Sequence, residues 1–538
     1  MTTASETALP PSGGWRARVQ GVLVLLSTPY GFAIFIGLYL GALFVLRITL
    51  FPGASEDDAE TLFLGQSLEG GYKPGQPPLY IWLAYGLTQV FGPALPVVVA
   101  LKFVCLGAIY FLTHRLARLF TGDGVWAAVA GLSVFGIYYL SWDAVLNYSQ
   151  TVLLAALALA FVHALARIAV KPSPGWGVFI WFGAIAGAGM MAKYNFAVLA
   201  VAVLAAALFD RDLRGKLLSG GGLLAALIAI TMAGPHIIWA LDGNVQTASL
   251  AHAAPAPSGS ALVTRMGGLA DMVVAIISVL SPLLIFLILV FPRVAWRTGD
   301  TGDTDETRLR WRRLCERTFW ILMALMTATV LISGVGEVRN HWFIVLAPFP
   351  AYAVLRIAAV YPLRSGEQMS ARIAGFVCVM GVLGLVVGVG VTARALTLPA
   401  RCTKCKMVVP YAQLAEGLTN AGFTRGTVYV YDYPTQVGGN LRRFFPNSRF
   451  VSYKFATYTP PPSNEEGAQC LAVWLLGAGD QSPSVGTMLG QLQNRFGVAP
   501  LPEGGLMSTI NVMLPGRTEP LTYGYILIDD LSRQGTCR

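Results

Sequence analysis

Residues 55–82 read SEDDAETLFLGQSLEGGYKPGQPPLYIW and decide how the rest of the chain is interpreted. They follow the first long apolar segment and place four carboxylates within five positions, at Glu56, Asp57, Asp58 and Glu60. Carboxylates that share a membrane surface repel one another and lose hydration, which is costly unless cations, a metal or a polar substrate offset it. The run therefore indicates a functional site. An alternative stays open, because anions favour a helix N-terminus and the run could merely cap a helix that begins near Asp58.

Composition identifies the class of protein. Hydrophobic residues fill 55% of the 538 positions and charged residues only 12%, and the apolar residues come in runs long enough to cross a bilayer. The net charge of +10 would suggest a nucleic-acid partner in a soluble protein. Here, however, the basic residues gather in short loops between apolar runs, as they do in membrane proteins. The chain is therefore predicted to be a polytopic α-helical membrane protein with no nucleic-acid partner.

The basic residues also set the predicted topology. Arg16 and Arg18 precede the first apolar run, residues 30–50, so the positive-inside rule places residues 1–29 in the cytoplasm. That run is long enough to stay as an anchor, and no cleavable signal peptide is expected. The first outer loop is then residues 51–93.

Residues 77–91 are short for a membrane span and are predicted to lie in the outer interface. This placement keeps the basic cluster HRLAR, residues 114–118, on the cytoplasmic side. About eleven transmembrane helices result, within a membrane domain that covers residues 30–395. They are predicted at residues 30–50, 94–112, 125–140, 151–169, 176–191, 196–208, 217–240, 272–291, 318–333, 342–360 and 373–391.

Residues 396–538 change character and alternate helix and strand patterns, which predicts a small α/β domain outside the membrane. Four of the seven cysteines lie there, at Cys402, Cys405, Cys470 and Cys537. An even number in an oxidising compartment predicts disulfides, whose pairing the sequence leaves open. Cys402 and Cys405 could instead form half of a zinc site or a redox pair, but no second CxxC or histidine pair accompanies them.

Polar side chains collect at the outer ends of the predicted spans and could line one cavity. Lys193 is the most informative, because an ammonium group between two apolar segments is energetically costly unless an anion pairs with it. A lipid phosphate is the obvious anion at that depth. Snorkelling to the interface is the alternative for Lys193. Arg339 and His341 lie at a similar level and could be interfacial anchors, while Asp143 is either a site residue or a helix cap.

These groups fit one kind of chemistry. Carboxylates can accept a proton from an attacking hydroxyl or stabilise positive charge at a sugar carbon, while Lys and Arg side chains neutralise a departing phosphate. The aromatic segment PPLYIW would suit a long isoprenoid tail. The predicted reaction is group transfer from a phospholipid-like donor, and the residues alone do not identify the group.

The same segment resembles the first outer loop of family 39-like glycosyltransferases of the GT-C fold, the group that includes protein O-mannosyltransferases and lipid A aminoarabinose transferases. The likeness consists of an acidic pair, a juxtamembrane helix, a Gly-Tyr turn and a Pro-Pro-Leu segment at residues 77–79. It implies a GT-C fold in which Asp57 is the catalytic aspartate and Asp58 its acidic neighbour. Residues 192–194, Ala-Lys-Tyr, resemble the turn that faces the donor phosphate, and residues 339–348 resemble the late basic turn.

One departure from the family pattern concerns the donor phosphate. Gln76 stands where the family has a lysine before the two prolines, and Lys73 lies three residues earlier. Either Lys73 reaches the phosphate instead, or Lys193 and Arg339 neutralise more of the phosphate's negative charge.

The resemblance implies an inverting glycosyltransferase at the periplasmic face of a bacterial inner membrane. It would move a sugar from a polyprenyl-phosphate donor to a cell-envelope lipid, glycan or protein. Asp57 would act as base or charge stabiliser with Asp58 in support, and this acidic pair could also hold a divalent cation, although its spacing does not demand one. The donor phosphate is expected at Lys73, Lys193 and Arg339, and other substrate contacts at Gln76, Tyr80, Asp143, Tyr194 and His341.

Two alternatives remain at this point. A transporter or flippase for polyprenyl-linked lipids would also need cations and an entrance from the lipid. A non-catalytic membrane scaffold that presents the outer α/β domain would tolerate the loss of Asp57.

Overall fold

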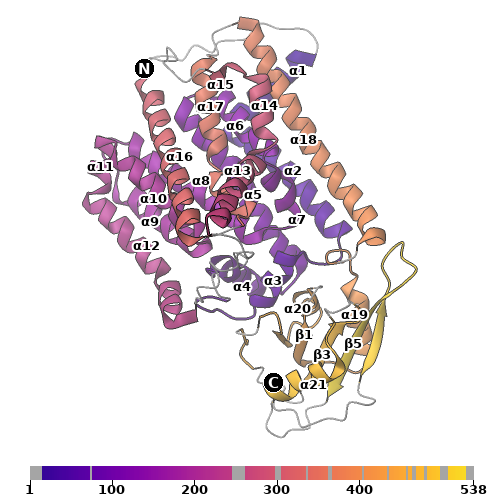
Figure 1. Cartoon of the computed structure of the whole chain (residues 1–538). Helices are drawn as coiled ribbons and strands as arrows, with labels where there is room; N and C mark the ends of the chain where they lie inside the picture. The colour runs from indigo at the N-terminus through magenta and orange to yellow at the C-terminus, as the bar shows by residue number, and fades with distance from the viewer. Residues whose placement is uncertain are drawn as a thin grey trace.

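The computed structural model describes residues 15–72, 76–244, 261–296, 305–334, 337–361, 366–402, 405–432, 436–455, 458–462, 468–477, 482–496 and 507–528. Figure 1 shows a large helical bundle and a smaller α/β unit at one end of it. The elements of the bundle are α1 (Trp15–Ser27), α2 (Pro29–Leu50), α3 (Glu56–Leu64), α4 (Leu79–Phe91), α5 (Leu95–Thr121), α6 (Gly124–Ser133), η1 (Val134–Gly136), η2 (Tyr139–Asp143), α7 (Ala144–Leu146), α8 (Ser149–Val170), α9 (Trp176–Ala192), α10 (Asn195–Leu208), α11 (Arg211–Leu217), α12 (Gly220–Trp239), η3 (Ala240–Asn244), α13 (Ala261–Leu280), α14 (Leu283–Val290), α15 (Arg293–Trp296), α16 (Glu306–Ser333), η5 (Asn340–Leu346), α17 (Phe349–Val360) and α18 (Gly366–Arg401).

Seven helices of the described residues are long and apolar enough to cross a membrane, and the pair η5 and α17, bent by 50°, would make an eighth. The prediction of a multi-pass helical membrane protein is confirmed. Several predicted spans are shorter or broken. The span predicted at 272–291 is interrupted at Pro282, which lacks the N–H that a continuous helix needs at that position. The segments predicted at 176–191 and 196–208 form α9 and α10, with 17 and 14 residues.

Two short helices flank opposite ends of the bundle (Figure 1). α4 has 13 residues, too few to cross a bilayer, in keeping with its expected interfacial position. α1 forms within the predicted N-terminal cytoplasmic segment and packs against α6. The first apolar segment is thus preceded by a further helix.

α8 is the central helix. Of the seven long spans in the described part of the chain, it has the largest buried share, 72% of its apolar window. Its sequence SQTVLLAALALAFVHALARIAV is apolar around most of its circumference, as expected for a helix surrounded by others. Its alanines let α5 and α9 approach closely on two sides. The burial of α8 fixes the position of its first residue, Ser149, at the end of the bundle where α3 packs.

The C-terminal unit contains a five-stranded sheet in the order β2-β1-β3-β5-β4. β1 pairs in parallel with β2 and β3, while β5 pairs antiparallel with β3 and β4. This agrees with the predicted small α/β domain. Its elements are α19 (Tyr411–Asn420), β1 (Gly426–Tyr431), α20 (Val437–Arg442), β2 (Arg449–Ser452), β3 (Gln469–Leu475), α21 (Val485–Phe496), β4 (Ser508–Val512) and β5 (Leu521–Ile528).

Three of the four cysteines after residue 396 form disulfides, in agreement with the prediction. Cys402 is bonded to Cys405 at the junction between α18 and the C-terminal unit. A zinc site at this CxxC is therefore excluded, because both thiolates that would bind the metal are oxidised. Cys470 is also disulfide-bonded, and the remaining predicted cysteine, Cys537, lies outside the described residues.

Candidate active site

The acidic run begins α3. Ser55 is the N-cap residue, and its hydroxyl accepts a hydrogen bond from the backbone N–H of Asp58 at 3.2 Å. Glu56, Asp57 and Asp58 form the first turn, where the helix dipole favours negative charge. The capping interpretation is correct for the position of the run. It does not account for the carboxylates, however, because each reaches a different set of partners.

Asp58 forms a completely buried ion-pair cluster. Lys102 of α5 lies 3.0 Å from one carboxylate oxygen, Arg47 of α2 lies 3.4 Å from the other, and the hydroxyl of Ser149 donates at 3.1 Å. Burial alone would raise the pKa of Asp58, but the two cations and their hydrogen bonds outweigh it and hold that pKa below its ordinary value. Asp58 is thus an ionised anchor that ties α3 to α2, α5 and α8.

Asp57 has a different environment. It is half-buried, and its Oδ2 accepts a hydrogen bond from the backbone N–H of Ser149, the first residue of α8, at 3.0 Å. Burial and the neighbouring charges of Glu60 and Asp58 raise the pKa of Asp57 to about 6, against the opposing effect of Lys102 and Lys193. A carboxylate with a pKa just below neutrality is ionised at pH 7 and can still take up a proton, as a general base must.

Lys193 lies between α9 and α10 and faces α8. Its ammonium donates to the hydroxyl of Thr151 at 3.0 Å, and its charge acts on Asp57. The next residue, Tyr194, has its hydroxyl 2.9 Å from Nε2 of His236 on α12. Nδ1 of His236 donates to the carbonyl of Gly70 at 2.8 Å, so the Lys193 turn is connected to the first outer loop.

The late basic turn leads into η5, which packs against the start of α8. Asn340 donates to the hydroxyl of Tyr139 at 2.6 Å, and the ring of His341 lies 6.1 Å from that of Tyr148. Tyr148 precedes α8 in the left-handed conformation, with φ of 62°, which is uncommon for a residue other than glycine. Arg339 is exposed, and its charge and that of Lys193 both act on His341. Arg339 and His341 therefore lie near the Lys193 turn.

The other predicted contacts have distinct positions. Tyr80 is 1% exposed and interacts with Val98 and Ser149 inside the bundle. Oε1 of Gln76 is buried and has no hydrogen-bond partner among the described residues, which leaves it free to accept from a substrate hydroxyl. Asp143 stands at the N-cap position of α7, but its side chain makes no cap hydrogen bond and interacts with Tyr138 instead. Lys73 lies outside the described residues.

A divalent cation at the acidic pair would have few ligands to use. The described residues contain no group of three or more metal-binding side chains. Both oxygens of Asp58 already meet Lys102, Arg47 or Ser149. Only Asp57 has a carboxylate that could turn to a metal, and hard cations usually require more oxygen ligands than one carboxylate supplies.

The C-terminal unit holds the other side of α3, which lies between the bundle and α20 (Figure 1). Asn440 of α20 is completely buried, and its Oδ1 accepts a hydrogen bond from the backbone N–H of Ala54 at 2.8 Å. A Cβ at Gly439 would lie 1.9 Å from the carbonyl oxygen of Ala59, so only glycine allows this close approach. Glu56 forms ion pairs with Lys406 and Lys454.

The comparisons agree with this architecture. Residues 75–239 match the model of the dolichyl-phosphate-mannose-protein mannosyltransferase family. The crystal structure of ArnT from Cupriavidus metallidurans bound to undecaprenyl phosphate superposes with a TM-score of 0.57 at 13% identity and covers 91% of this chain and 97% of that one. The chain has the GT-C glycosyltransferase fold. The fold predicted from the resemblance in the first outer loop is thereby confirmed.

Curated relatives extend the likeness over most of this GT-C chain. The lipopolysaccharide core galacturonosyltransferase RgtA of Rhizobium johnstonii is 29% identical over 81% of this chain and 86% of its own length. The galacturonosyltransferase RgtB of the same organism is 27% identical over 86% of this chain and 91% of its own length. The predicted enzyme class, a glycosyltransferase, is confirmed.

Sequence reasoning missed several residues that build the site. Arg47, Lys102 and Ser149 hold the acidic pair, and Asn440 supports α3 from a distance of 386 positions. The sequence did indicate that Arg47 and Lys102 are unusual, because a cation inside an apolar run requires a partner of opposite charge. No sequence pattern indicated Ser149 or Asn440.

Proposed function

We propose that this protein is an inverting glycosyltransferase that moves galacturonic acid from a polyprenyl-phosphate donor to a sugar of a lipopolysaccharide core. The reaction would take place at the periplasmic face of a bacterial inner membrane, with the N-terminus in the cytoplasm. The observation that carries the proposal is the position of Asp57. Its carboxylate accepts a hydrogen bond from the backbone of Ser149 at the start of α8, and the positive charge of Lys193 acts on its pKa.

The chemistry is a single displacement. Asp57 accepts the proton of the acceptor hydroxyl while the hydroxyl oxygen forms a bond to C1 of the sugar. The bond between C1 and the phosphate oxygen breaks, and its electron pair leaves with polyprenyl phosphate. Lys193 and Arg339 neutralise the charge that develops on this leaving group. One displacement inverts the configuration at C1.

The charges of the site suit a uronic acid donor. Such a donor carries two negative groups, its phosphate and the carboxylate of the sugar. Lys193 and exposed Arg339 supply cations, while Asp58 is already neutralised within its own cluster. The names of the two relatives, both lipopolysaccharide core galacturonosyltransferases, support the same sugar and acceptor.

The test is a transfer assay with purified protein and three polyprenyl-phosphate donors that carry galacturonic acid, mannose or aminoarabinose. Wild type should transfer galacturonic acid to a lipopolysaccharide core acceptor, and Asp57→Asn should not. Glu416→Gln, a charge-neutralising change on the exposed face of α19, is the matched control and should transfer normally. Transfer of another sugar would overturn the choice of donor. Binding without any turnover would favour a transporter.

A further inference from the structure

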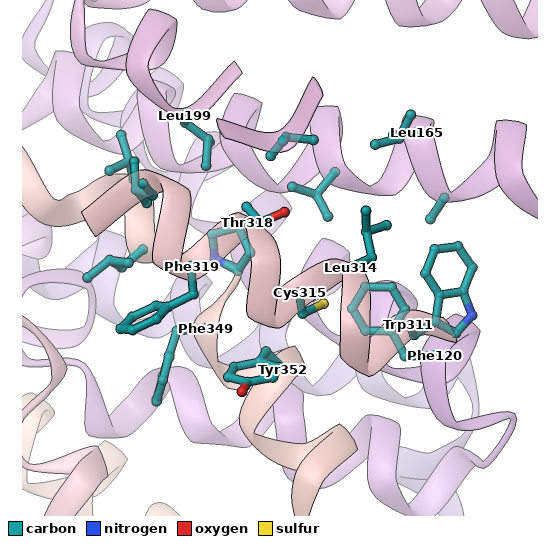
Figure 2. Close-up of a pocket in the computed structure, with 17 residues that line it drawn as sticks. Phe120, Leu165, Leu199, Trp311, Leu314, Cys315, Thr318, Phe319, Phe349 and Tyr352 are labelled. Carbon is teal, nitrogen blue, oxygen red and sulfur yellow. The ribbon is translucent and has the colours of Figure 1, made fainter. Parts of the chain in front are cut away.

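An apolar cavity lies between α8, α10, α16 and α17 (Figure 2). The void itself is about 70 Å³, below the roughly 300–1,000 Å³ of pockets that enclose a whole ligand, so it has room for only a short part of a larger molecule. Figure 2 shows Leu314, Cys315 and Thr318 of α16 among the aromatic and aliphatic side chains of the lining. The lining contains no charged residue, so the cavity suits a hydrocarbon chain.

A basic hollow adjoins this cavity, and Trp311 and Leu314 line both. The hollow is formed by the last residues of α8, the residues that follow α10, and the first turns of α16. α8 begins at Ser149 beside Asp57 and ends at Val170 in the hollow. Its 22 residues span roughly 33 Å at 1.5 Å per residue. The hollow is therefore at the opposite end of the bundle from the candidate active site.

Two arginines of the hollow have no carboxylate within ion-pair distance in the described part of the chain. Arg313 and Arg317 lie one turn apart on α16 and are exposed. Arg313 donates to the carbonyl of its own helix at Leu309, and the guanidinium of Arg317 lies 5.5 Å from the ring centroid of Phe209. Two guanidinium groups on one helix face can bind an external phosphate.

Three of the neighbouring carboxylates are already paired with other arginines. Arg310 binds Asp210 at 2.6 Å and Asp212 at 2.8 Å. Glu316 lies 3.7 Å from Arg312 and 3.9 Å from Arg356. Asp210 and Asp212, which line the hollow, are therefore engaged by Arg310 rather than by Arg313 or Arg317, while Glu306, the third carboxylate of the lining, lies exposed at the start of α16.

Aromatic residues indicate that this hollow lies at the membrane surface. Phe209 is 68% exposed and Trp320 is 69% exposed, beside the two free arginines. α16 changes at this level from a charged first third to an apolar remainder. Aromatic and basic side chains at such a boundary are typical of the headgroup region.

We propose that the cavity and the hollow together bind one anionic glycerophospholipid. Its phosphate lies on Arg313 and Arg317, and part of one acyl chain passes Trp311 and Leu314 into the cavity while the rest lies along the surface of the bundle. Basic pockets between transmembrane helices recognise lipid headgroups in this way. The lipid is separate from the sugar donor and holds α16 against α8 and α10.

The test is native mass spectrometry of delipidated protein titrated with cardiolipin, phosphatidylglycerol, phosphatidylcholine or decyl phosphate. We expect one cardiolipin or phosphatidylglycerol to bind at least tenfold more tightly than phosphatidylcholine. Combined Arg313→Gln and Arg317→Gln should remove this preference. The matched control, Arg308→Gln with Arg312→Gln, removes the same charge from the same helix at arginines that already have acidic partners, and it should keep the preference.

A second pair of variants tests the chain in the cavity. Thr318→Phe fills the cavity and should weaken phosphatidylglycerol binding, whereas Thr329→Phe, on the exposed face of the same helix, should not. Equal binding of neutral and anionic lipids, or unchanged binding by the double arginine variant, would overturn the headgroup assignment. Unchanged binding by Thr318→Phe, or equally tight binding of short-chain decyl phosphate, would overturn the acyl-chain assignment.

Discussion

The carboxylate of Asp57 accepts a hydrogen bond from the backbone N–H of Ser149 at 3.0 Å, which joins the first outer loop to the most buried long helix. Asp58, the next residue, makes its own contact with the hydroxyl of Ser149 at 3.1 Å. One residue of α8 thus orients both acidic side chains. The two carboxylates nevertheless differ in burial and in charge partners, and they are expected to respond differently to substitution.

Asp57→Asn should abolish most of the activity without unfolding the protein. The amide cannot accept the proton of the acceptor hydroxyl, and loss of a general base typically costs about 10²- to 10⁴-fold in rate. The measurement is kcat for sugar transfer, with the thermal melting temperature as a control for folding. Transfer within twofold of wild type would show that Asp57 is not the base.

Asp58→Asn should instead destabilise the protein, because Lys102 and Arg47 would keep their charges in a buried place without a carboxylate. Removal of one partner from a buried ion pair typically costs about 3–5 kcal/mol. Lys102→Met should cost less, since Asp58 would keep Arg47. Folded yield and melting temperature of the two variants provide the comparison, and equal losses would contradict the ion-pair account.

The sequence predicted the membrane class and the C-terminal α/β domain because long apolar runs and alternating strand patterns are local features. It predicted span boundaries less well, since Pro282 breaks a helix whose apolar run continues on both sides. The likeness to a known loop suggested Asp57, and the structure adds its environment. Asn440 could not be found, because its contact with Ala54 depends on how two distant segments pack.

Activity should fall at acidic pH with an inflection near 6. Asp57 has a pKa raised to about 6 by burial and by Glu60, so it is a carboxylate above this pH and loses its base function as it is protonated below it. Glu60→Gln removes one of the charges that raise the pKa and should move the inflection to lower pH. The measurement is kcat/KM against pH for both proteins, because this ratio reports ionisations of the free enzyme. An unshifted acid limb in Glu60→Gln would show that another group controls it.

Lys193→Met should weaken use of the donor by roughly 10- to 100-fold in kcat/KM, because a charge-assisted hydrogen bond to phosphate is worth about 1.5–3 kcal/mol. Lys193→Arg keeps the charge and should recover part of this loss. Thr151→Val removes only the hydroxyl that Lys193 contacts and should have a smaller effect. The assay varies the donor concentration at a fixed acceptor concentration, and an effect of Lys193→Met confined to the acceptor KM would contradict phosphate binding.

Asn440→Leu should reduce activity from outside the membrane domain. The substitution leaves the N–H of Ala54 without its acceptor in a buried place, directly before the cap of the helix that carries Asp57. Asn440→Asp keeps the oxygen that accepts this bond and should recover part of the activity. Asn511→Leu, on β4 of the same unit, is the control for general damage to the sheet. If Asn440→Leu lowers kcat and shifts the acidic part of the pH–rate profile, and Asn511→Leu does neither, the C-terminal unit positions Asp57. Equal losses of activity in both variants would mean that the C-terminal unit contributes stability alone.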